Sequence, residues 1–504
     1  MSARQPERVI GFADPEDGLR ARDVLVGAGY SEEGLRDALG IVDILDVRPI
    51  DRPAALRRTQ AEAPLLTLVR LLFLGAPVEE RAARGALAPM TLEAWLDAGL
   101  LALHAGEATP LVKVVPHRSF LVASDMPARI QSGAPDDFVL GVSKSSVLLG
   151  HTMIPRAAGQ TLDLGAGCGI LAFLASSHSD QVTATDKNPR AVAFTRFNAE
   201  INGIRNVASE AGDLFEPVAG RRFDLLISNP PYVIAPAVRY LFSDSGVRGD
   251  EFCRRLVGLA PSFLEEGGYC QVMANWGSAA GQSWQDPLAG WFEGSGCDVL
   301  VWGAETQDAS GYAMNWIQQT EADYLPRLSE LYDTWMSYYE REGIEAVTYG
   351  LIAMRRAPGR RNWVRFIKVP KGASAPSGEH ILRRFQAQDF LESAGGDEQL
   401  LDQRFRLAAD VRLEQHYAPR GGGLAAVATR LHLARDPAYY SMDVDTMVAA
   451  LVMGYREERP LRDVFEEMSR AMGVDLDQMV PGGLAVARRL VENAYLLPGG
   501  ATEP

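Results

Sequence analysis

The sequence predicts an α/β protein, with a mostly parallel sheet at its centre, a mainly helical region before the sheet and an α+β region after it. Three observations predict this organisation. Between residues 137 and 357, apolar strand-like runs alternate with helical patterns, as in a sheet whose two faces are covered by helices. Before residue 125, apolar side chains recur mainly at helical spacing. Beyond residue 360, strand-like runs come first and helical patterns follow.

The N-terminal region, residues 1–130, is expected to be mainly helical. Apolar spacing predicts helices over 64–74 and 91–103, and Pro64 suits the first helical turn. Extended runs at 111–115 and 119–123 predict a small hairpin after them. Helices followed by a hairpin are typical of a winged-helix-like module. A helical cap on the next domain is an equal alternative.

The central region, residues 131–370, carries the alternating pattern. Its strand-like runs lie at 160–164, 182–185, 223–228, 269–274, 299–303 and 346–354. Its helical patterns lie at 170–176, 189–202, 250–264 and 321–342. Residues 362–369 are expected either to extend the sheet or to lead into a linker, because residues 370–378 are rich in Pro, Gly, Ser and Lys.

The C-terminal region, residues 371–504, is expected to be a β-then-α domain, and a winged-helix-like unit is one interpretation of its end. Runs at 405–415 and 424–434 predict a hairpin around Gly421, Gly422 and Gly423. Helical patterns follow at 443–454, 461–472 and 483–494.

Composition limits the class of protein. The 504 residues are 47% hydrophobic and 23% charged, which fits a soluble globular protein of roughly two to four domains. No apolar run is long enough to cross a membrane, and no signal-peptide pattern opens the chain. The four cysteines form no CxxC pair, so no zinc site or disulfide framework is expected, and the cytoplasm is the expected compartment.

Charge and histidine usage narrow the expected partners. The net charge of −15 argues against a partner held mainly through its phosphates, although a local basic patch can sit on an acidic protein. The seven histidines show no ligand spacing, so no metal site is expected. Arg355-Arg356, Arg360-Arg361 and Arg383-Arg384 can contact phosphates, but a solvated face explains them more simply.

A glycine-rich turn joins the first central strand to the following helix. It comprises Gly165, Ala166, Gly167, Cys168 and Gly169. Glycines allow a sharp turn and close approach of a ligand, and the helix N-terminus offers free N–H groups. Such a turn alone also fits dinucleotide binding.

Acidic residues at neighbouring strand ends suggest a nucleoside ligand. Asp186, followed by Lys187, ends the second strand, where a carboxylate can accept hydrogen bonds from both ribose hydroxyls. Asp213 can accept from an adenine amino group, while Leu214 or Phe215 covers the ring. Asp163 is expected to face the same crevice and to engage the amino group of a methionyl moiety. The alternative is that these acids cap helices and turns.

The strand at 223–228 runs into Asn229, Pro230, Pro231 and Tyr232. Two prolines end the ladder and make the turn rigid. The Asn229 side-chain oxygen and the Pro230 carbonyl are fixed acceptors for the N–H groups of a planar nitrogen, and Tyr232 can stack on its flat face. No strong base is required, so positioning and preorganised electrostatics are expected to carry the rate. An ordinary strand-ending turn is the alternative.

These motifs give the central region a family resemblance. Residues 141–276 resemble class I S-adenosylmethionine (SAM)-dependent methyltransferases of the NPPY type, in particular release-factor glutamine methyltransferases and ribosomal RNA guanine-N2 methyltransferases. The resemblance implies a Rossmann-like sheet of seven strands with an antiparallel last hairpin. It implies SAM as the cofactor, and places residues 143–149 beside its methionyl end. Residues 233–237 lack the substrate loop expected of the release-factor enzymes.

We therefore predict a SAM-dependent N-methyltransferase whose substrate is a protein glutamine side chain, favoured by the acidic balance. An RNA or DNA base amino group (guanine N2 or adenine N6) is the alternative, and a SAM-binding regulatory protein is another. A cluster of aromatic residues is expected either to stack on the substrate or to pack in the core. Its members are Trp276, Trp284, Trp291, Trp302, Tyr312 and Trp316.

Overall fold

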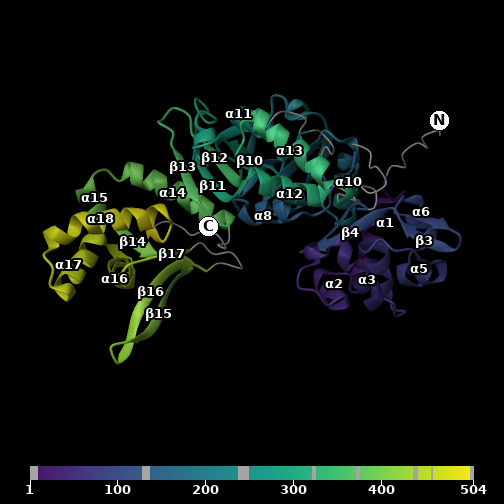
Figure 1. Ribbon diagram of the computed structural model, residues 1–504, viewed down its shortest axis with the longest axis horizontal. Helices are drawn as coiled ribbons and strands as arrows, with labels where there is room; N and C mark the ends of the chain where they lie inside the picture. The colour runs from purple at the N-terminus through teal and green to yellow at the C-terminus, as the bar shows by residue number, and fades with distance from the viewer. Residues whose placement is uncertain are drawn as a thin grey trace. The chain divides into compact units, whose positions relative to one another are not determined.

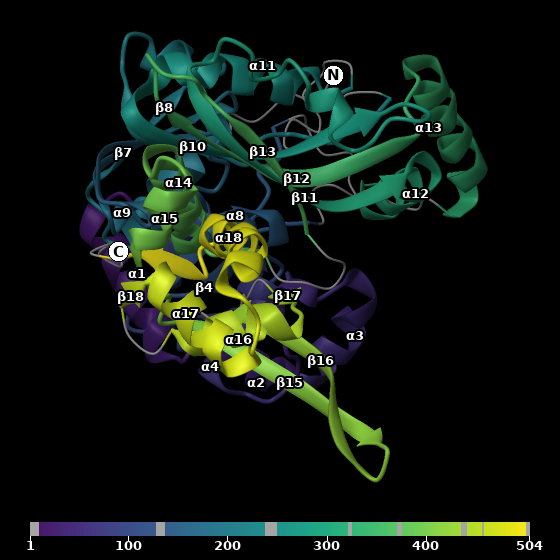
Figure 2. The same ribbon diagram turned by 90° about the vertical axis from the view of Figure 1, so that its left-hand side faces the viewer.

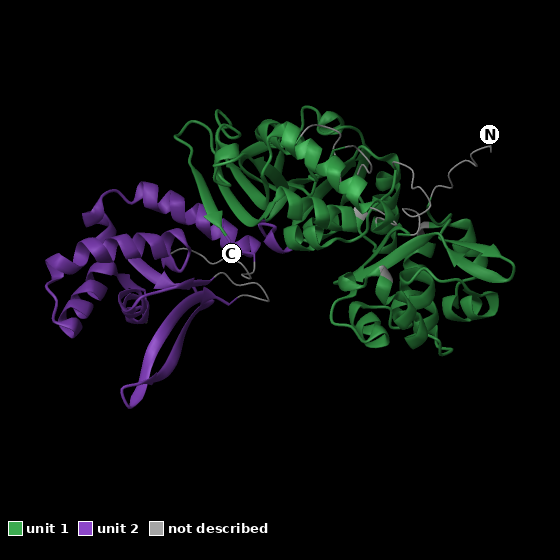
Figure 3. Ribbon diagram, viewed as in Figure 1, with its two compact units in different colours: residues 1–150, 157–368 green, residues 151–156, 369–504 purple. Residues whose placement is uncertain are grey.

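The computed structural model describes residues 10–127, 137–236, 249–320, 325–369, 375–434, 441–455 and 458–499. The chain divides into two compact units, residues 1–150 with 157–368 and residues 151–156 with 369–504 (Figure 3). The first unit contains both the N-terminal region and the central sheet. The helices within the described ranges lack the combination of length and hydropathy that a membrane span needs.

The first unit is built around an eight-stranded sheet with the order β13-β11-β12-β10-β9-β6-β7-β8 (Figure 1). The strands are β6 (Ala158–Leu164), β7 (Ser179–Asp186), β8 (Val207–Ala211), β9 (Phe223–Ser228), β10 (Leu264–Ser278), β11 (Cys297–Asp308), β12 (Ala346–Arg356) and β13 (Val364–Lys368). Neighbours from β8 to β10 are parallel, whereas β12 is antiparallel to both β10 and β11. This confirms the Rossmann-like α/β fold with an antiparallel hairpin, and β13 extends it.

Three predicted crossover helices are present as α9 (Ile170–Ser176), α10 (Pro189–Ile201) and α11 (Glu251–Leu259). The predicted helix 321–342 begins only at α13 (Leu328–Glu342), and residues 321–324 lie outside the described residues. The sequence analysis missed α12 (Ala309–Thr320), which follows β11 without a break. It also missed β8, an edge strand whose residues are only half-buried or exposed and therefore show no apolar run.

The long hairpin strands project beyond the shorter parallel ones. Figure 2 shows β11 and β12 running towards α12 and α13. A hydrophobic cluster joins these helices to the chain that follows β9, and its fully buried members include Ile234, Tyr339 and Val347. The ligand edge of the sheet therefore has an additional wall of strand and helix.

The N-terminal region contains short helices and two small sheets. Its helices are α1 (Pro15–Gly27), α2 (Glu32–Leu39), α3 (Arg52–Arg58), α4 (Pro64–Leu68), α5 (Glu80–Leu87) and α6 (Leu92–Asp97). Its strands are β1 (Val78–Glu79), β2 (Leu101–His104), β3 (Glu107–Pro110), β4 (Val112–His117) and β5 (Phe120–Asp125). The β4–β5 hairpin confirms the prediction, but the helix expected over 91–103 ends at Asp97 and its last residues form β2. Gly99, with φ 72°, turns the chain between them.

Asparagine side chains of α10 hold this region against the central sheet. The Asn198 side chain accepts from the Ala123 N–H and donates to its carbonyl, both at 2.8 Å. Asn202 makes the same pair of bonds with Leu121, at 2.9 and 2.8 Å. The side chains thus act as a partner strand for one edge of β5. These contacts favour the cap over an independent winged-helix-like module.

The second unit combines helices with two three-stranded sheets. Its elements are α14 (Gly378–Ser393), α15 (Asp397–Asp402), β14 (Arg404–Leu407), β15 (Val411–Arg420), β16 (Gly423–Leu433), β17 (Ser441–Asp443), α16 (Thr446–Gly454), β18 (Arg459–Pro460), α17 (Leu461–Met472), α18 (Leu476–Glu492) and β19 (Leu496–Pro498). The β15–β16 hairpin turns at Gly421 and Gly422, as predicted, but the run expected over 405–415 is divided between β14 and β15, and β15 continues to Arg420. The β-then-α order was incomplete, because α14 and α15 precede the strands. Arg383 is buried and pairs with Asp410 at 2.8 Å, so it is not on a solvated face.

Candidate active site

A cavity of about 280 Å³ opens at the carboxyl ends of β6, β7 and β9. Strand order reverses between β6 and β9, which is where ligands bind in open α/β sheets. Most of the predicted cofactor residues line it. They are Gly165, Ala166, Gly167, Cys168, Asp186, Lys187, Asp213, Leu214 and Asn229, joined by Pro230 and Pro231 of the proline turn. We call this space the cofactor cavity.

The glycine turn is held in place by side chains on two sides. One Asp186 oxygen accepts from the Gly167 N–H and the other from the Asn188 N–H, both at 2.8 Å. The Thr195 hydroxyl donates to the Gly167 carbonyl at 3.0 Å. Gly165 and Gly167 have φ of 76° and 57°, and a Cβ on either would meet no atom within 4 Å. The turn therefore leaves open space at the cavity wall that a ligand can fill.

Gly169 lies behind the turn rather than on the cavity wall. Its φ is 86°, and a Cβ there would come within 2.6 Å of the Phe173 ring. Glycine is needed at this position for the close approach of the turn to α9. The sequence predicted Gly169 as a cofactor-binding residue, but the structure places it against α9 and not in the described lining of the cavity.

Of the three predicted site residues after β8, Asp213 and Leu214 line the cofactor cavity and Phe215 lies in the core. The carboxylate of Asp213 lies 3.9 Å from the Lys187 ammonium, across the cavity lining. Leu214 lines the cavity with the left-handed φ of 47°, which is strained for a leucine. Phe215 instead stacks on Phe263 in the core, with ring centroids 4.2 Å apart. Of the two side chains expected to cover an adenine ring, Leu214 is in the described cavity lining and Phe215 is in the core.

Asp163 is fully buried and is not part of the cavity lining. One of its oxygens accepts from the Ala172 N–H at 2.9 Å, and the other has no partner in the described part of the chain. Burial raises its pKa to about 7. Asp163 therefore caps the start of α9, which is the alternative that the sequence left open, and its predicted contact with a methionyl amino group stays a prediction.

We expect the unfolding free energy of Asp163→Asn to rise relative to that of the parent protein as the pH is raised. The folded pKa of about 7 exceeds the unfolded value of about 3.9, so the folded parent binds a proton more tightly and loses stability between pH 4 and 7. Asparagine has no such loss. Urea unfolding at pH 5 and pH 8 should show the difference in unfolding free energy moving by about 2 kcal/mol in favour of the variant. Parallel pH curves for the two proteins would contradict the raised pKa.

Asn229 is held by the first turn of α8 (Lys144–Thr152). Its side-chain nitrogen donates to the hydroxyls of Ser145 at 3.0 Å and Ser146 at 3.1 Å. Its side-chain oxygen is buried and has no hydrogen-bond partner among the described residues. The resemblance placed residues 143–149 beside the cofactor, and Ser143 and Ser146 do line the cofactor cavity.

A second cavity, of about 830 Å³, lies next to the first. The two cavities share four lining residues, Leu140, Ser143, Asn229 and Pro230. Tyr232 lines only the second cavity, and its ring lies 5.7 Å from that of Tyr349 on β12. We call this space the substrate cavity. Asn229 and Pro230 therefore stand at the junction of two spaces.

The walls of the substrate cavity come from three parts of the first unit. Asn275, Glu305 and Tyr349 lie in register across β10, β11 and β12. The α12 residues Tyr312, Asn315, Trp316 and Gln319 and the N-terminal residues Leu45, Asp46 and Arg48 complete the lining, together with others.

The segment after Tyr232 forms part of this wall, although no substrate loop was recognisable there from the sequence. The Ile234 N–H donates to the Tyr312 hydroxyl at 3.2 Å, and the Tyr339 hydroxyl donates to the Ile234 carbonyl at 2.8 Å. Asn275 also donates to the Tyr312 hydroxyl, at 2.6 Å. Residues 233–236 are thus anchored on α12 and α13, while residue 237 lies outside the described residues.

The positively charged side chains in the described lining of the substrate cavity lie beside carboxylates. Lys144 forms an ion pair with Asp46, and Arg48 lies 3.4 Å from the carboxylate of Asp51. Each of the two cations in the described lining therefore has a carboxylate beside it. The described residues also contain no group of His, Cys, Asp and Glu arranged to hold a metal ion.

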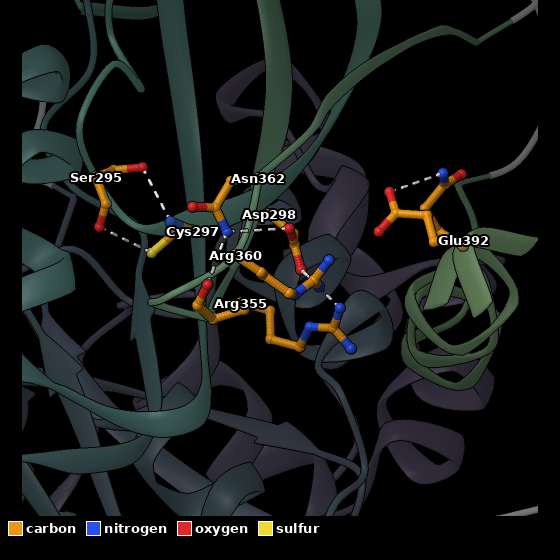
Figure 4. Close-up of polar contacts among 9 residues, drawn as sticks. Ser295, Cys297, Asp298, Arg355, Arg360, Asn362 and Glu392 are labelled. Atoms are coloured by element: carbon orange, nitrogen blue, oxygen red, sulfur yellow. Dashed lines mark hydrogen bonds and ion pairs between the residues drawn. The ribbon is translucent and has the colours of Figure 1, made fainter. Parts of the chain in front are cut away.

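The tryptophans and paired arginines of the central domain mostly have structural positions. Trp276 and Trp302 are fully buried, which fits the core interpretation, whereas Trp316 lines the substrate cavity. Arg355 and Arg360 both pair with Asp298, which is fully buried (Figure 4). The positive charges of these two arginines are therefore balanced by a buried carboxylate, which explains their positions without a bound phosphate.

Sequence reasoning missed several cavity residues because their signal was only apolar or came from distant segments. The cofactor cavity is also lined by Phe138, Val139, Leu140, Phe252 and Arg255. Phe252 and Arg255 lie on α11, whose spacing predicted a helix without indicating which residues meet a ligand.

Comparison with known proteins gives matches in three regions. Residues 140–283 match the family described as Methyltransferase small domain. Residues 27–111 and 383–498 each match a family described as a domain of unknown function, DUF7059 and DUF7782 respectively. The first match contains all the predicted site residues.

Relatives of the central region carry two kinds of name. A release factor glutamine methyltransferase of Geobacter sulfurreducens is 34% identical over 31% of this chain and 56% of its own length. A Methanocaldococcus jannaschii protein provisionally named a protein N5-glutamine methyltransferase is 30% identical over 26% of this chain and 69% of its own. A ribosomal RNA small subunit methyltransferase C of Alcanivorax borkumensis is 32% identical over 23% of this chain and 32% of its own. This chain thus spans little more than half of the Geobacter relative.

Proposed function

Because this chain belongs to the class I SAM-dependent methyltransferases, we propose that it transfers the methyl group of SAM to a planar nitrogen, that of a glutamine side chain in a protein. The observation that carries this proposal is the junction of the two cavities at Asn229 and Pro230. A methyl donor in one cavity and a nitrogen in the other would meet there.

The cofactor cavity fits SAM in the chemistry of its lining. The open space beside Gly165 and Gly167 suits the close approach of a nucleoside, and Asp186 and Asp213 offer carboxylate acceptors for hydroxyl and amino groups. When bound, SAM supplies an electrophilic methyl group on a sulfonium. The residues of this chain would bind the cofactor, orient the acceptor nitrogen and exclude water.

Asn229 and Pro230 are suited to an amide nitrogen. The lone pair of a carboxamide nitrogen is delocalised, and two fixed acceptors on its N–H groups would orient it and favour the charge that develops on methylation. The Asn229 oxygen is buried and has no partner within the described ranges, which is costly unless a donor reaches it. A substrate N–H would supply that donor.

The neutral balance of the substrate cavity favours an uncharged side chain over a phosphodiester strand. Its two described cations have carboxylate partners, and the whole chain carries a net charge of −15. A strand of nucleic acid would need cations free to neutralise phosphates. Relatives named glutamine methyltransferases agree with this assignment.

One observation favours a second candidate, the amino group of a nucleic-acid base. Four aromatic residues line the substrate cavity, Tyr232, Tyr312, Trp316 and Tyr349. Aromatic rings can stack on a flipped base. A relative named as a ribosomal RNA methyltransferase agrees with it.

Label transfer tests both candidates. The protein would be incubated with methyl-tritiated SAM and a lysate of the source organism lacking its gene, then treated with protease or nuclease. Label that survives nuclease and is lost on protease supports the glutamine proposal, and acid hydrolysis should then release it as methylamine. Label lost on nuclease would reverse the assignment. Absence of transfer under any condition would support a SAM-binding regulatory protein.

A further inference from the structure

The side-chain amide of Asn229 can present either of two faces to a substrate. Turning it by 180° exchanges its oxygen for its NH₂ group with little change of shape, but it converts an acceptor into a donor. The proposed reaction needs the oxygen at the cavity junction. Something in the fold must therefore decide the orientation.

Helix α8 supplies two partners for the NH₂ group. The hydroxyls of Ser145 and Ser146 lie 3.0 and 3.1 Å from the Asn229 nitrogen, so both of its N–H bonds are used. Within the part of the chain that the structure describes, the oxygen has no partner and is the available acceptor. A serine hydroxyl can also donate, so the reverse orientation is disfavoured only where the hydroxyl hydrogen is used elsewhere. Ser143 has a single hydroxyl hydrogen for its contacts with both hydroxyls, so at least one of them donates to Ser143 and can only accept from Asn229.

Ser143 holds the two hydroxyls in turn. Its own hydroxyl oxygen lies 2.9 Å from each of them and accepts the Ser146 N–H at 3.1 Å. Side-chain hydrogen bonds with Ser145 and Tyr349 oppose the burial that raises the pKa of Tyr232. Ser145 therefore contacts both Asn229 and Tyr232, the first and last residues of the proline turn.

We propose that Ser145 and Ser146 are positioning residues that fix the Asn229 amide with its oxygen towards the substrate. The inference rests on the proposed function of Asn229. It also narrows the substrate, because a nitrogen without hydrogen, or a carboxylate, would find no donor on this residue. The methylated nitrogen must carry hydrogen before the reaction.

Ser145 gives the cleaner variant, because it lines the substrate cavity and not the cofactor cavity, whereas Ser146 lines the cofactor cavity. Ser145→Ala should lower kcat about tenfold, and Ser145→Ala with Ser146→Ala about a hundredfold, with SAM affinity of the single variant unchanged. Ser145→Thr keeps the hydroxyl and should restore most of the rate. Ser177→Ala, which removes a hydroxyl bonded to the Leu174 carbonyl on the surface, is the matched control.

Nuclear magnetic resonance tests the hydrogen bonds of the Asn229 NH₂ group without requiring turnover. In the full chain with S-adenosylhomocysteine, the Asn229 NH₂ signal is identified by its loss in Asn229→Asp. Its protons should exchange with water at least about tenfold faster in the double serine variant than in the parent, because two hydrogen bonds are lost. Unchanged exchange, or unchanged kcat in Ser145→Ala, would overturn the positioning role. Failure of label transfer by the parent would instead overturn the proposed function, since the exchange measurement stands independently of it.

Discussion

Replacing Asn229 with alanine should lower kcat about a thousandfold and leave SAM affinity within about threefold of the parent value. The physical reason is the position of the residue at the junction of the two cavities, with a side-chain oxygen that has no partner among the residues that the structure describes. Removing a single fixed partner of a reacting group typically costs about 10²–10³ in rate. Loss of orientation of the nitrogen adds to that cost.

Single-turnover transfer of tritium to the labelled lysate fraction, with SAM binding by calorimetry, separates these effects. Asn315→Ala is the matched control, because Asn315 lines the substrate cavity but its side-chain oxygen already accepts from Gln319 at 2.9 Å. That variant should keep most of its activity. Near-parental kcat in Asn229→Ala would remove Asn229 from the chemistry, and an equal loss in Asn315→Ala would mean that the cavity tolerates no change at all.

Local sequence signals predicted the half of the site that is built at strand ends. The turn from Gly165 to Gly169 and the turn from Asn229 to Tyr232 each follow a buried strand, and parallel strands bring their carboxyl ends to one edge. Within this half, errors arose where a side chain could point either way. Asp163 and Phe215 each stand next to a residue that lines the cofactor cavity, Leu164 and Leu214 respectively, yet both are buried away from the described lining. Strand and turn patterns do not resolve such one-residue differences.

The other half of the site depends on contacts between distant segments. Asp46 and Arg48 of the N-terminal region line the substrate cavity, and the side chains of Asn198 and Asn202 bind β5 of the same region. Tyr312 enters it because α12 follows β11 without a loop, and the sequence showed no boundary there. No periodicity in a single segment encodes such pairings, which arise from tertiary packing.

Replacing Asp186 with alanine should weaken SAM binding about 10- to 100-fold, the equivalent of roughly 1–3 kcal/mol. Both of its carboxylate oxygens accept main-chain N–H groups, so the variant loses the support of the glycine turn as well as an acceptor for the cofactor. Asp213→Ala should cost less, because Asp213 is half-exposed and its nearest cation, on Lys187, is 3.9 Å away. Calorimetric titration with SAM measures both affinities, and thermal unfolding without ligand checks that the fold persists.

Because burial already raises the pKa of Asp186, SAM affinity of the parent should fall as the pH is lowered, and this dependence should weaken in Asp186→Ala. An unchanged affinity for SAM in Asp186→Ala would show that this carboxylate does not bind the cofactor and only supports the turn. Asp213 would then be the remaining carboxylate that could bind the nucleoside.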